Sequence, residues 1–111
     1  MEDELVGWGR VVRIETTGRK TGRTIPVVVG FVERDGGAIV IAATSPDAAW
    51  ARNLEAEPRC RATIGERSWV AEARPLDGRE HAAAVRDLIL RYGTPSEGLG
   101  SGTSFELVPV D

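Results

Sequence analysis

The run of residues 16–23 has the composition most suited to binding chemistry. It reads Thr-Thr-Gly-Arg-Lys-Thr-Gly-Arg, so that Arg19, Lys20 and Arg23 place three cations within five residues. Arginine offers a forked donor to a phosphate or carboxylate, and lysine offers a mobile point charge. The two glycines permit backbone conformations that direct successive N–H groups at one anion, and the threonine hydroxyls add further donors. The run is therefore a candidate anion-binding loop.

Three interpretations of this loop stay open from the residue types alone. It can bind a small anionic ligand, it can be a solvated hairpin turn with surface arginines, or it can contact polynucleotide phosphates. The glycine spacing fits neither a P-loop nor a dinucleotide fingerprint. The net charge of −3 and the few aromatic residues placed to stack bases weigh against the third interpretation, so we expect no nucleic-acid partner.

Other residues of reactive type are few. His81 is the only histidine and is predicted to lie on the apolar side of a helix, where a structural role is the simpler interpretation. Cys60 is the only cysteine, which excludes an intramolecular disulfide, and it alternates with core positions as a small buried apolar residue does. One histidine and one cysteine far apart do not make a ligand set, so no metal site is expected.

The first half of the chain reads as three strands and a helix. Strands are predicted over 11–16, 25–33 and 38–43, the last buried on both faces. Polar residues 17–24 connect the first two strands, and Asp-Gly chemistry at 34–37 gives a turn. A helix is then predicted from Ser45-Pro46-Asp47 to Ala56, with Ser45 as its cap. Its apolar face would present Trp50, Asn53 and Leu54.

The second half reads as a strand pair, a helix and a last strand. Positions 59–64 alternate with strand periodicity, Gly65-Glu66 fits a two-residue hairpin, and a return strand covers 67–75. Asp77 and Glu80 have capping-box spacing. The helix that follows would group on one side His81, Val85, Leu88, Ile89 and Tyr92. Residues 93–102 are glycine-rich and predict a mobile loop, and a final strand is predicted over 105–110.

These elements predict a single domain over residues 1–111 of mainly β (β+α) class, with a six-stranded antiparallel sheet that closes on itself and two short helices. A length of 111 residues suits one core. The acidic N-terminus has no apolar run behind it, and no stretch approaches the length of a membrane span. We therefore expect a cytoplasmic protein without a membrane span.

Two motifs in order resemble the deazaflavin (coenzyme F-420)-dependent nitroreductase and quinone reductase family. Residues 16–22 match the family's TTGRKTG signature, and 23–26 match the Arg-x-x-Pro that follows it. Downstream come a small-residue pair at 42–43 and Trp-x-x-Asn-Leu at 50–54, then Pro58 and the hairpin. The resemblance extends from about residue 11 to residue 110. It implies a split β-barrel like the FMN-binding barrels.

The resemblance also implies a bound F-420 whose phosphate and acidic tail lie on the basic loop. Arg19, Lys20, Thr21 and Arg23 would then meet the anionic part of the coenzyme. Pro26 is implied to border the ring or its linker. The residues implied to lie near the ring are Ala43, Thr44 and Ser45, and those on the helix beside the cofactor site are Trp50 and Asn53. FMN is the second choice of cofactor.

In this interpretation the cofactor carries the reaction, and reduced F-420 delivers a hydride to a small electrophilic acceptor such as a quinone, a nitroaromatic or an activated alkene. No side chain need act as a nucleophile. A proton for the reduced product could come from Tyr92, Ser45 or water. A homodimer is compatible with the resemblance.

The chain also departs from the family pattern. The segment 44–49 is shorter than usual and lacks a lysine and a His-Pro pair, and only Tyr92 matches the C-terminal tyrosines. This favours, as the alternative, a non-catalytic barrel that holds F-420, FMN or haem as a carrier or sensor.

Overall fold

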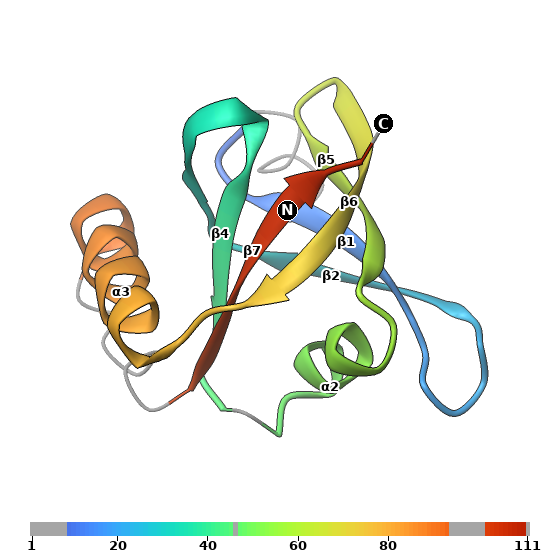
Figure 1. Ribbon diagram of the computed structural model, residues 1–111. Helices are drawn as coiled ribbons and strands as arrows, with labels where there is room; N and C mark the ends of the chain where they lie inside the picture. The colour runs from blue at the N-terminus through green and yellow to red at the C-terminus, as the bar shows by residue number, and fades with distance from the viewer. Residues whose placement is uncertain (1–8, 46, 94–101, 111) are drawn as a thin grey trace.

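The computed structural model describes residues 9–45, 47–93 and 102–110. Seven strands and two α-helices make up this part of the chain (Figure 1). The predicted mobile loop at 93–102 falls mostly outside the described residues. The elements are β1 (Val12–Thr17), β2 (Thr24–Val29), β3 (Val32–Glu33), the 3-10 turn η1 (Asp35–Gly37), β4 (Ile39–Ala43), α2 (Ala49–Ala56), β5 (Arg59–Ile64), β6 (Arg67–Pro75), α3 (Gly78–Tyr92) and β7 (Thr103–Pro109).

The strands form one curled antiparallel sheet in the order β2-β1-β5-β6-β7-β4-β3. Its two edge strands, β2 and β3, are neighbours in sequence and are joined by Gly30 and Phe31. The barrel is therefore split: the chain continues from one edge to the other without a hydrogen-bonded ladder between them. The predicted fold class, a mainly β split barrel with two helices, is confirmed.

The strand count is seven rather than the predicted six, because the expected single strand over 25–33 is broken. Gly30 and Phe31 separate β2 from β3, and Phe31 is buried. An added Cβ at Gly30 would lie 2.9 Å from the Tyr92 ring, so the chain turns where only glycine fits under that ring. The periodicity of a run rich in β-branched residues does not indicate such a corner, because the residue that packs on Gly30, Tyr92, belongs to α3.

Strand periodicity fixes which side chains fill the barrel. Val12 and Ile14 of β1 and Cys60, Ala62 and Ile64 of β5 are buried, while their neighbours in sequence face outward. Every residue of β4 is buried, as predicted, because one face lines the barrel core and α3 packs against the strand. The hairpin at Gly65-Glu66 is also confirmed, with Gly65 at a φ of 60° in the first turn position.

Helix α2 begins at Ala49, three residues later than the sequence predicts. Ser45 does not cap it: the Ser45 hydroxyl accepts the Asp47 N–H at 3.1 Å, and the Ser45 carbonyl accepts the Ala48 N–H at 3.1 Å. These bonds build a turn before the helix, and the residue in the N-cap position, Ala48, has no capping side chain. Competition between a local turn and a cap is typical of serine.

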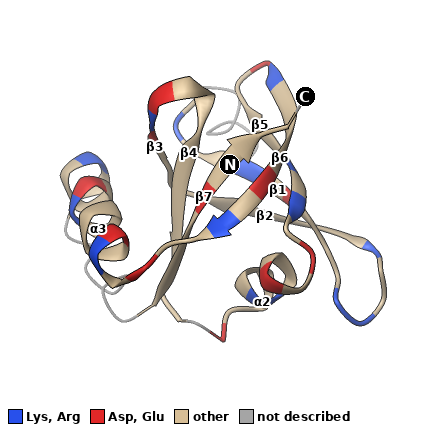
Figure 2. Ribbon diagram, in the orientation of Figure 1, with Lys and Arg blue, Asp and Glu red and all other residues tan. Residues whose placement is uncertain are grey.

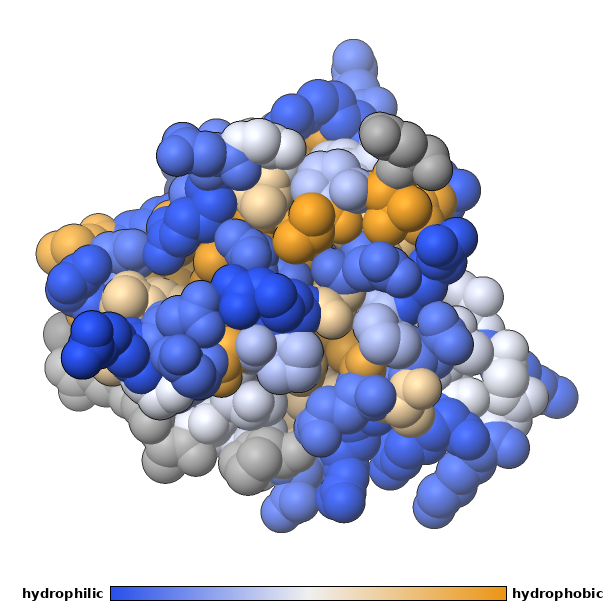
Figure 3. Space-filling view, viewed as in Figure 1, coloured by the Kyte–Doolittle hydropathy of each residue, from blue (hydrophilic) through white to orange (hydrophobic). Residues whose placement is uncertain are grey.

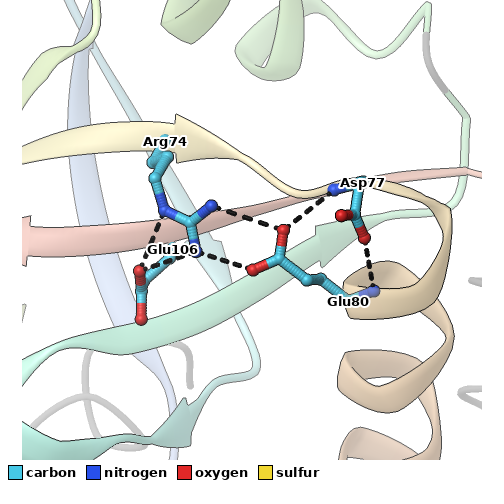
Figure 4. Close-up of polar contacts among 4 residues, drawn as sticks. All are labelled: Arg74, Asp77, Glu80 and Glu106. Atoms are coloured by element: carbon cyan, nitrogen blue, oxygen red, sulfur yellow. Dashed lines mark hydrogen bonds and ion pairs between the residues drawn. The ribbon is translucent and has the colours of Figure 1, made fainter.

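Helix α3 begins with the predicted capping box (Figure 4). The Asp77 carboxylate accepts the Glu80 N–H at 2.8 Å, and the Glu80 carboxylate accepts the Asp77 N–H at 3.3 Å. Glu80 and Glu106 of β7 both bind Arg74 of β6, at 2.8 and 3.0 Å. Two hydrogen bonds lower the pKa of the Glu80 carboxyl: the one from Arg74 has the larger effect, and the one from the Asp77 N–H has the smaller effect. The start of α3 is thus tied to the sheet that the helix covers.

The surface is largely hydrophilic on the face shown in Figure 3, with apolar side chains in small separate patches. Three large apolar side chains are exposed among the described residues: Ile25, Leu90 and Val108. None of the described helices is long and apolar enough to cross a membrane.

Candidate functional site

The basic loop projects from the barrel as the tip of the β1–β2 hairpin (Figures 1 and 2). Its ends are closed by the Gly18 N–H, which donates to the Arg23 carbonyl at 2.8 Å, and the Gly22 N–H donates to the Gly18 carbonyl at 2.8 Å. A Cβ at Gly18 would lie 2.9 Å from side-chain atoms of both Thr21 and Ile25, and Gly22 has a φ of +71°. One glycine therefore permits close packing and the other a left-handed turn.

Most backbone N–H groups of the loop are used within the protein. Those of Gly18, Arg19, Gly22 and Arg23 donate to protein acceptors. The two adjacent N–H groups at the tip, of Lys20 and Thr21, have no acceptor among the described residues. A backbone contribution to anion binding is therefore narrowed to these two groups, beside the side chains of the loop.

A buried amide connects the loop to helix α2. Asn53 is 2% exposed, and its Oδ1 accepts the Arg19 N–H at 3.2 Å and Arg19 Nη1 at 2.9 Å. Arg19 Nη1 also reaches the Ala49 carbonyl at 3.4 Å. On the other side, Asn53 Nδ2 lies 3.4 Å from Thr16 Oγ1, which donates to the Ile25 carbonyl at 3.1 Å. Every acceptor of Arg19 is neutral, so its positive charge is not cancelled.

The other two cations have no such anchor. Lys20 and Arg23 are exposed, and neither side chain has a hydrogen-bond or ion-pair partner within the described ranges. Five arginines elsewhere in the described part of the chain, by contrast, pair with carboxylates, as Arg34 pairs with Asp87 at 2.8 Å. The loop therefore carries an uncompensated positive charge on a protein whose net charge is −3.

A shallow pocket of about 150 Å³ lies between the loop and the first turn of α2. This volume is below the range that encloses a whole cofactor, and the wall of the pocket is mainly apolar. Its lining residues are Gly18, Arg19, Lys20, Thr21, Ile25, Ala49 and Asn53.

The structure thus brings four of the predicted site residues together: Arg19, Lys20, Thr21 and Asn53. Ile25, 42% exposed, and Ala49 complete the wall and were not among the predicted site residues. Strand periodicity could have placed Ile25 on the same face of β2 as the core-packed Val27.

Other predicted site residues lie outside this pocket. Pro26 pairs with Glu15 and faces away from the side of β2 that carries Ile25. Trp50 packs against Phe105, with ring centroids 6.2 Å apart. Ala43 is buried at the end of β4, where the backbone of Gly102 packs directly on its carbonyl, and Thr44 and Ser45 follow.

Tyr92, a predicted candidate proton donor, has its hydroxyl fully engaged at the opposite end of the hairpin. It donates to the Arg10 carbonyl at 2.8 Å, lies 3.2 Å from the Phe31 carbonyl and accepts the Phe31 N–H at 3.1 Å. These contacts lie beyond Val29 of β2, whereas the basic loop precedes Thr24, roughly 20 Å away along the strand. Tyr92 holds the corner between β2 and β3.

Cys60 has the properties of a core residue. It is buried in β5, and burial raises the pKa of its thiol to about 11. Because a thiolate is the reactive form, only about 0.1% of the thiol is ionised at pH 8. We expect a disulfide reagent at pH 8 to label Cys60 slowly in the folded protein and within the mixing time in denaturant. Rapid labelling of the folded protein would contradict this burial.

His81 links α3 to the sheet instead of facing the loop. Its Nδ1 lies 2.8 Å from the hydroxyl of the buried Ser104, and its Nε2 has no hydrogen-bond partner. This agrees with the structural interpretation of the only histidine.

Comparison with known proteins gives a family match and a set of similar folds. Residues 4–109 match a family model described as F420H2-dependent quinone reductase. No curated protein sequence matches the chain. At sequence identities below 25%, the structural matches that follow show a shared fold.

A structure named as the F420H2-dependent reductase FDR-A has a TM-score of 0.74 at 22% identity, over 88% of this chain and 93% of that one. HutZ from Vibrio cholerae, named as a haem storage protein, has a TM-score of 0.76 at 20% identity, over 98% and 87%. A structure named as an F-420 reductase has a TM-score of 0.68 at 17% identity, over 98% and 93%.

Proposed function

The chain belongs to the F420H2-dependent quinone reductase family, and we propose that it uses the deazaflavin coenzyme F-420 to transfer a hydride to a small electrophilic acceptor. The observation that carries this proposal is the uncompensated charge of Lys20 and Arg23 in the loop between β1 and β2, where Lys20 also lines a small pocket. A quinone is the acceptor favoured by the family description; a nitroaromatic or an activated alkene is the wider class.

The residues of the loop fit the anionic part of this coenzyme. Its phosphate and acidic tail need cations that no protein carboxylate has neutralised, and Lys20 and Arg23 satisfy that condition. Arg19 adds a third charge at the pocket wall, and the Thr21 hydroxyl lies beside it. Charge-assisted hydrogen bonds from such groups are the stronger class in proteins.

When bound, reduced F-420 supplies the hydride, and the chain supplies position. Lys20 and Arg23 would hold the acid groups, and Thr44 and Ser45, at the end of β4, would border the ring. The Ser45 hydroxyl accepts the Asp47 N–H, which leaves its own proton free to donate to a reduced product. Tyr92 is less suited to that step, because its proton is held by backbone carbonyls.

A non-catalytic barrel that holds a cofactor is the second candidate. Two observations favour it: the short segment 44–49, and the similarity of the fold to HutZ, named as a haem storage protein. FMN, the second cofactor expected from the sequence, has no support in the family description. A related structure named as a domain-swapped dimer, at 21% identity, supports the proposal of a homodimer.

The test is a titration of the purified protein with oxidised F-420, followed by tryptophan and cofactor fluorescence, with FMN and haemin in parallel. We expect micromolar binding of F-420 and much weaker binding of FMN. Reduced F-420 should then be reoxidised in the presence of a soluble quinone. Binding of F-420 without any turnover would favour the carrier, preferential binding of haemin would favour a haem protein, and binding of none of the three would overturn the proposed cofactor.

A further inference from the structure

We propose that the three cations of the basic loop have two different roles: Arg19, held by Asn53, fixes the position of the loop, and Lys20 and Arg23 bind the acid groups of the ligand. The ligand-binding half of this inference rests on the proposed function. The positioning half concerns the protein alone and can be tested without a cofactor.

Hydrogen bonding separates Arg19 from the other two cations. The Arg19 backbone N–H and the Arg19 guanidinium both donate hydrogen bonds to the same atom, Asn53 Oδ1, at 3.2 and 2.9 Å. Asn53 is buried on α2, 34 residues further along the chain, so that this one amide joins the hairpin tip to the helix. Lys20 and Arg23 have no comparable contact within the described ranges and can turn toward a ligand.

The chemistry of asparagine suits this position. An amide oxygen accepts two N–H donors and adds no negative charge, so the loop keeps all three positive charges while it is held in place. An aspartate there would accept the same two bonds but would cancel one charge. Fixing the loop before binding also reduces the conformational entropy that a ligand has to overcome.

The competing explanation is that Asn53 contacts the ligand directly and its bonds to Arg19 are incidental. The two explanations differ in the free protein. If Asn53 positions the loop, its loss must release the loop when no ligand is present.

The first measurement is therefore amide hydrogen exchange by NMR on the unliganded protein. In Asn53→Ala, exchange at the Arg19 N–H should accelerate at least about tenfold, the equivalent of one lost hydrogen bond. The Ala62 N–H in β5 serves as the reference for global destabilisation, and Lys20→Ala is the matched control that should leave Arg19 protected. Asn53→Asp keeps the acceptor for Arg19 but loses the Nδ2 donor to Thr16 Oγ1, so it should restore protection only in part. Unchanged exchange at Arg19 in Asn53→Ala, relative to Ala62, would overturn the positioning role.

The second measurement is the dependence of oxidised F-420 binding on salt concentration. Lys20→Ala and Arg23→Ala should each weaken binding and flatten its salt dependence, because each removes one charge that faces the ligand. Asn53→Ala should weaken binding about tenfold with the salt dependence unchanged, because every charge remains. Asn53→Asp should hold the loop in part but flatten the salt dependence, because it adds a negative charge beside Arg19.

Arg19→Lys separates the two roles, because it keeps the charge but removes the Nη1 that contacts Asn53 Oδ1 and the Ala49 carbonyl. It should weaken binding with the salt dependence unchanged, but less than Asn53→Ala does, because the backbone N–H of residue 19 still donates to Asn53. An Arg19→Lys variant that binds like the wild type would overturn the division of roles. Failure of the wild-type protein to bind F-420 would overturn the proposed function and the ligand-binding half, whereas the exchange experiment would still decide the positioning half.

Discussion

Replacement of both Lys20 and Arg23 by alanine is expected to weaken binding of oxidised F-420 by about 3 kcal/mol, roughly a 150-fold rise in Kd. Charge-assisted bonds contribute about 1.5–3 kcal/mol each, and the lower end applies because both side chains are exposed. The fold should be unaffected, since neither side chain has a partner in the described part of the chain. Fluorescence titration gives the Kd, and thermal unfolding tests the fold.

The matched control is Arg79→Ala with Arg86→Ala, which removes the same charge from the exposed side of α3. In Figure 2 that helix lies on the other side of the barrel from the loop. The control variant should bind F-420 with nearly the wild-type Kd. A Lys20/Arg23 variant that loses stability but keeps its affinity would show that the loop is structural and would refute the site assignment.

The second large effect is expected from Tyr92→Phe, which should lower the free energy of unfolding by about 2 kcal/mol. The change keeps the ring beside Gly30 but leaves the Phe31 N–H and carbonyl without their hydroxyl partner. A buried backbone group without a partner costs about 1–3 kcal/mol. Chemical denaturation of the wild type and the variant gives the difference.

The kinetic comparison decides between this structural role and proton donation. We expect folded Tyr92→Phe to keep the wild-type kcat for reduction of a quinone. Ser45→Ala should lower that kcat, because it removes the hydroxyl proposed to donate the proton. If Tyr92→Phe keeps its unfolding free energy and loses kcat, the hydroxyl acts in the reaction and the corner does not depend on it.

Local patterns predicted most of the fold. The return strand 67–75, the capping box and the full burial of β4 follow from residue order alone, because each depends on neighbours within a few positions. The alternation of Cys60 with charged neighbours likewise placed β5 with the right face inward. In each case, propensity, spacing and burial agree.

Errors occurred where a distant residue decides the local conformation. The break at Gly30 depends on Tyr92, 62 positions away; the glycine interrupts the β-branched run, but the local sequence does not show which ring lies against it. Similarly, the glycines of the loop predicted a backbone nest, and one N–H of the loop, that of Arg19, is instead taken by Asn53. A side chain on another element cannot be predicted from the loop sequence.

The location of the candidate site was therefore predictable from the composition of the loop, but the separate roles of its three cations were not. Three cations in a short run identified the loop, and the family resemblance placed Asn53 near it. That one cation is anchored while two are free depends on the register of α2 against β1, which only the folded chain defines.

The position of the loop at the tip of a projecting hairpin also has a kinetic consequence. Among the described residues outside the loop, arginines and carboxylates nearly balance and are intermixed over the barrel and α3, whereas the loop holds three cations and no acid (Figure 2). An anionic partner diffusing nearby is therefore drawn to the hairpin tip. Encounters are thus oriented before contact, and the association rate constant should fall steeply with ionic strength, while the rate of escape changes little.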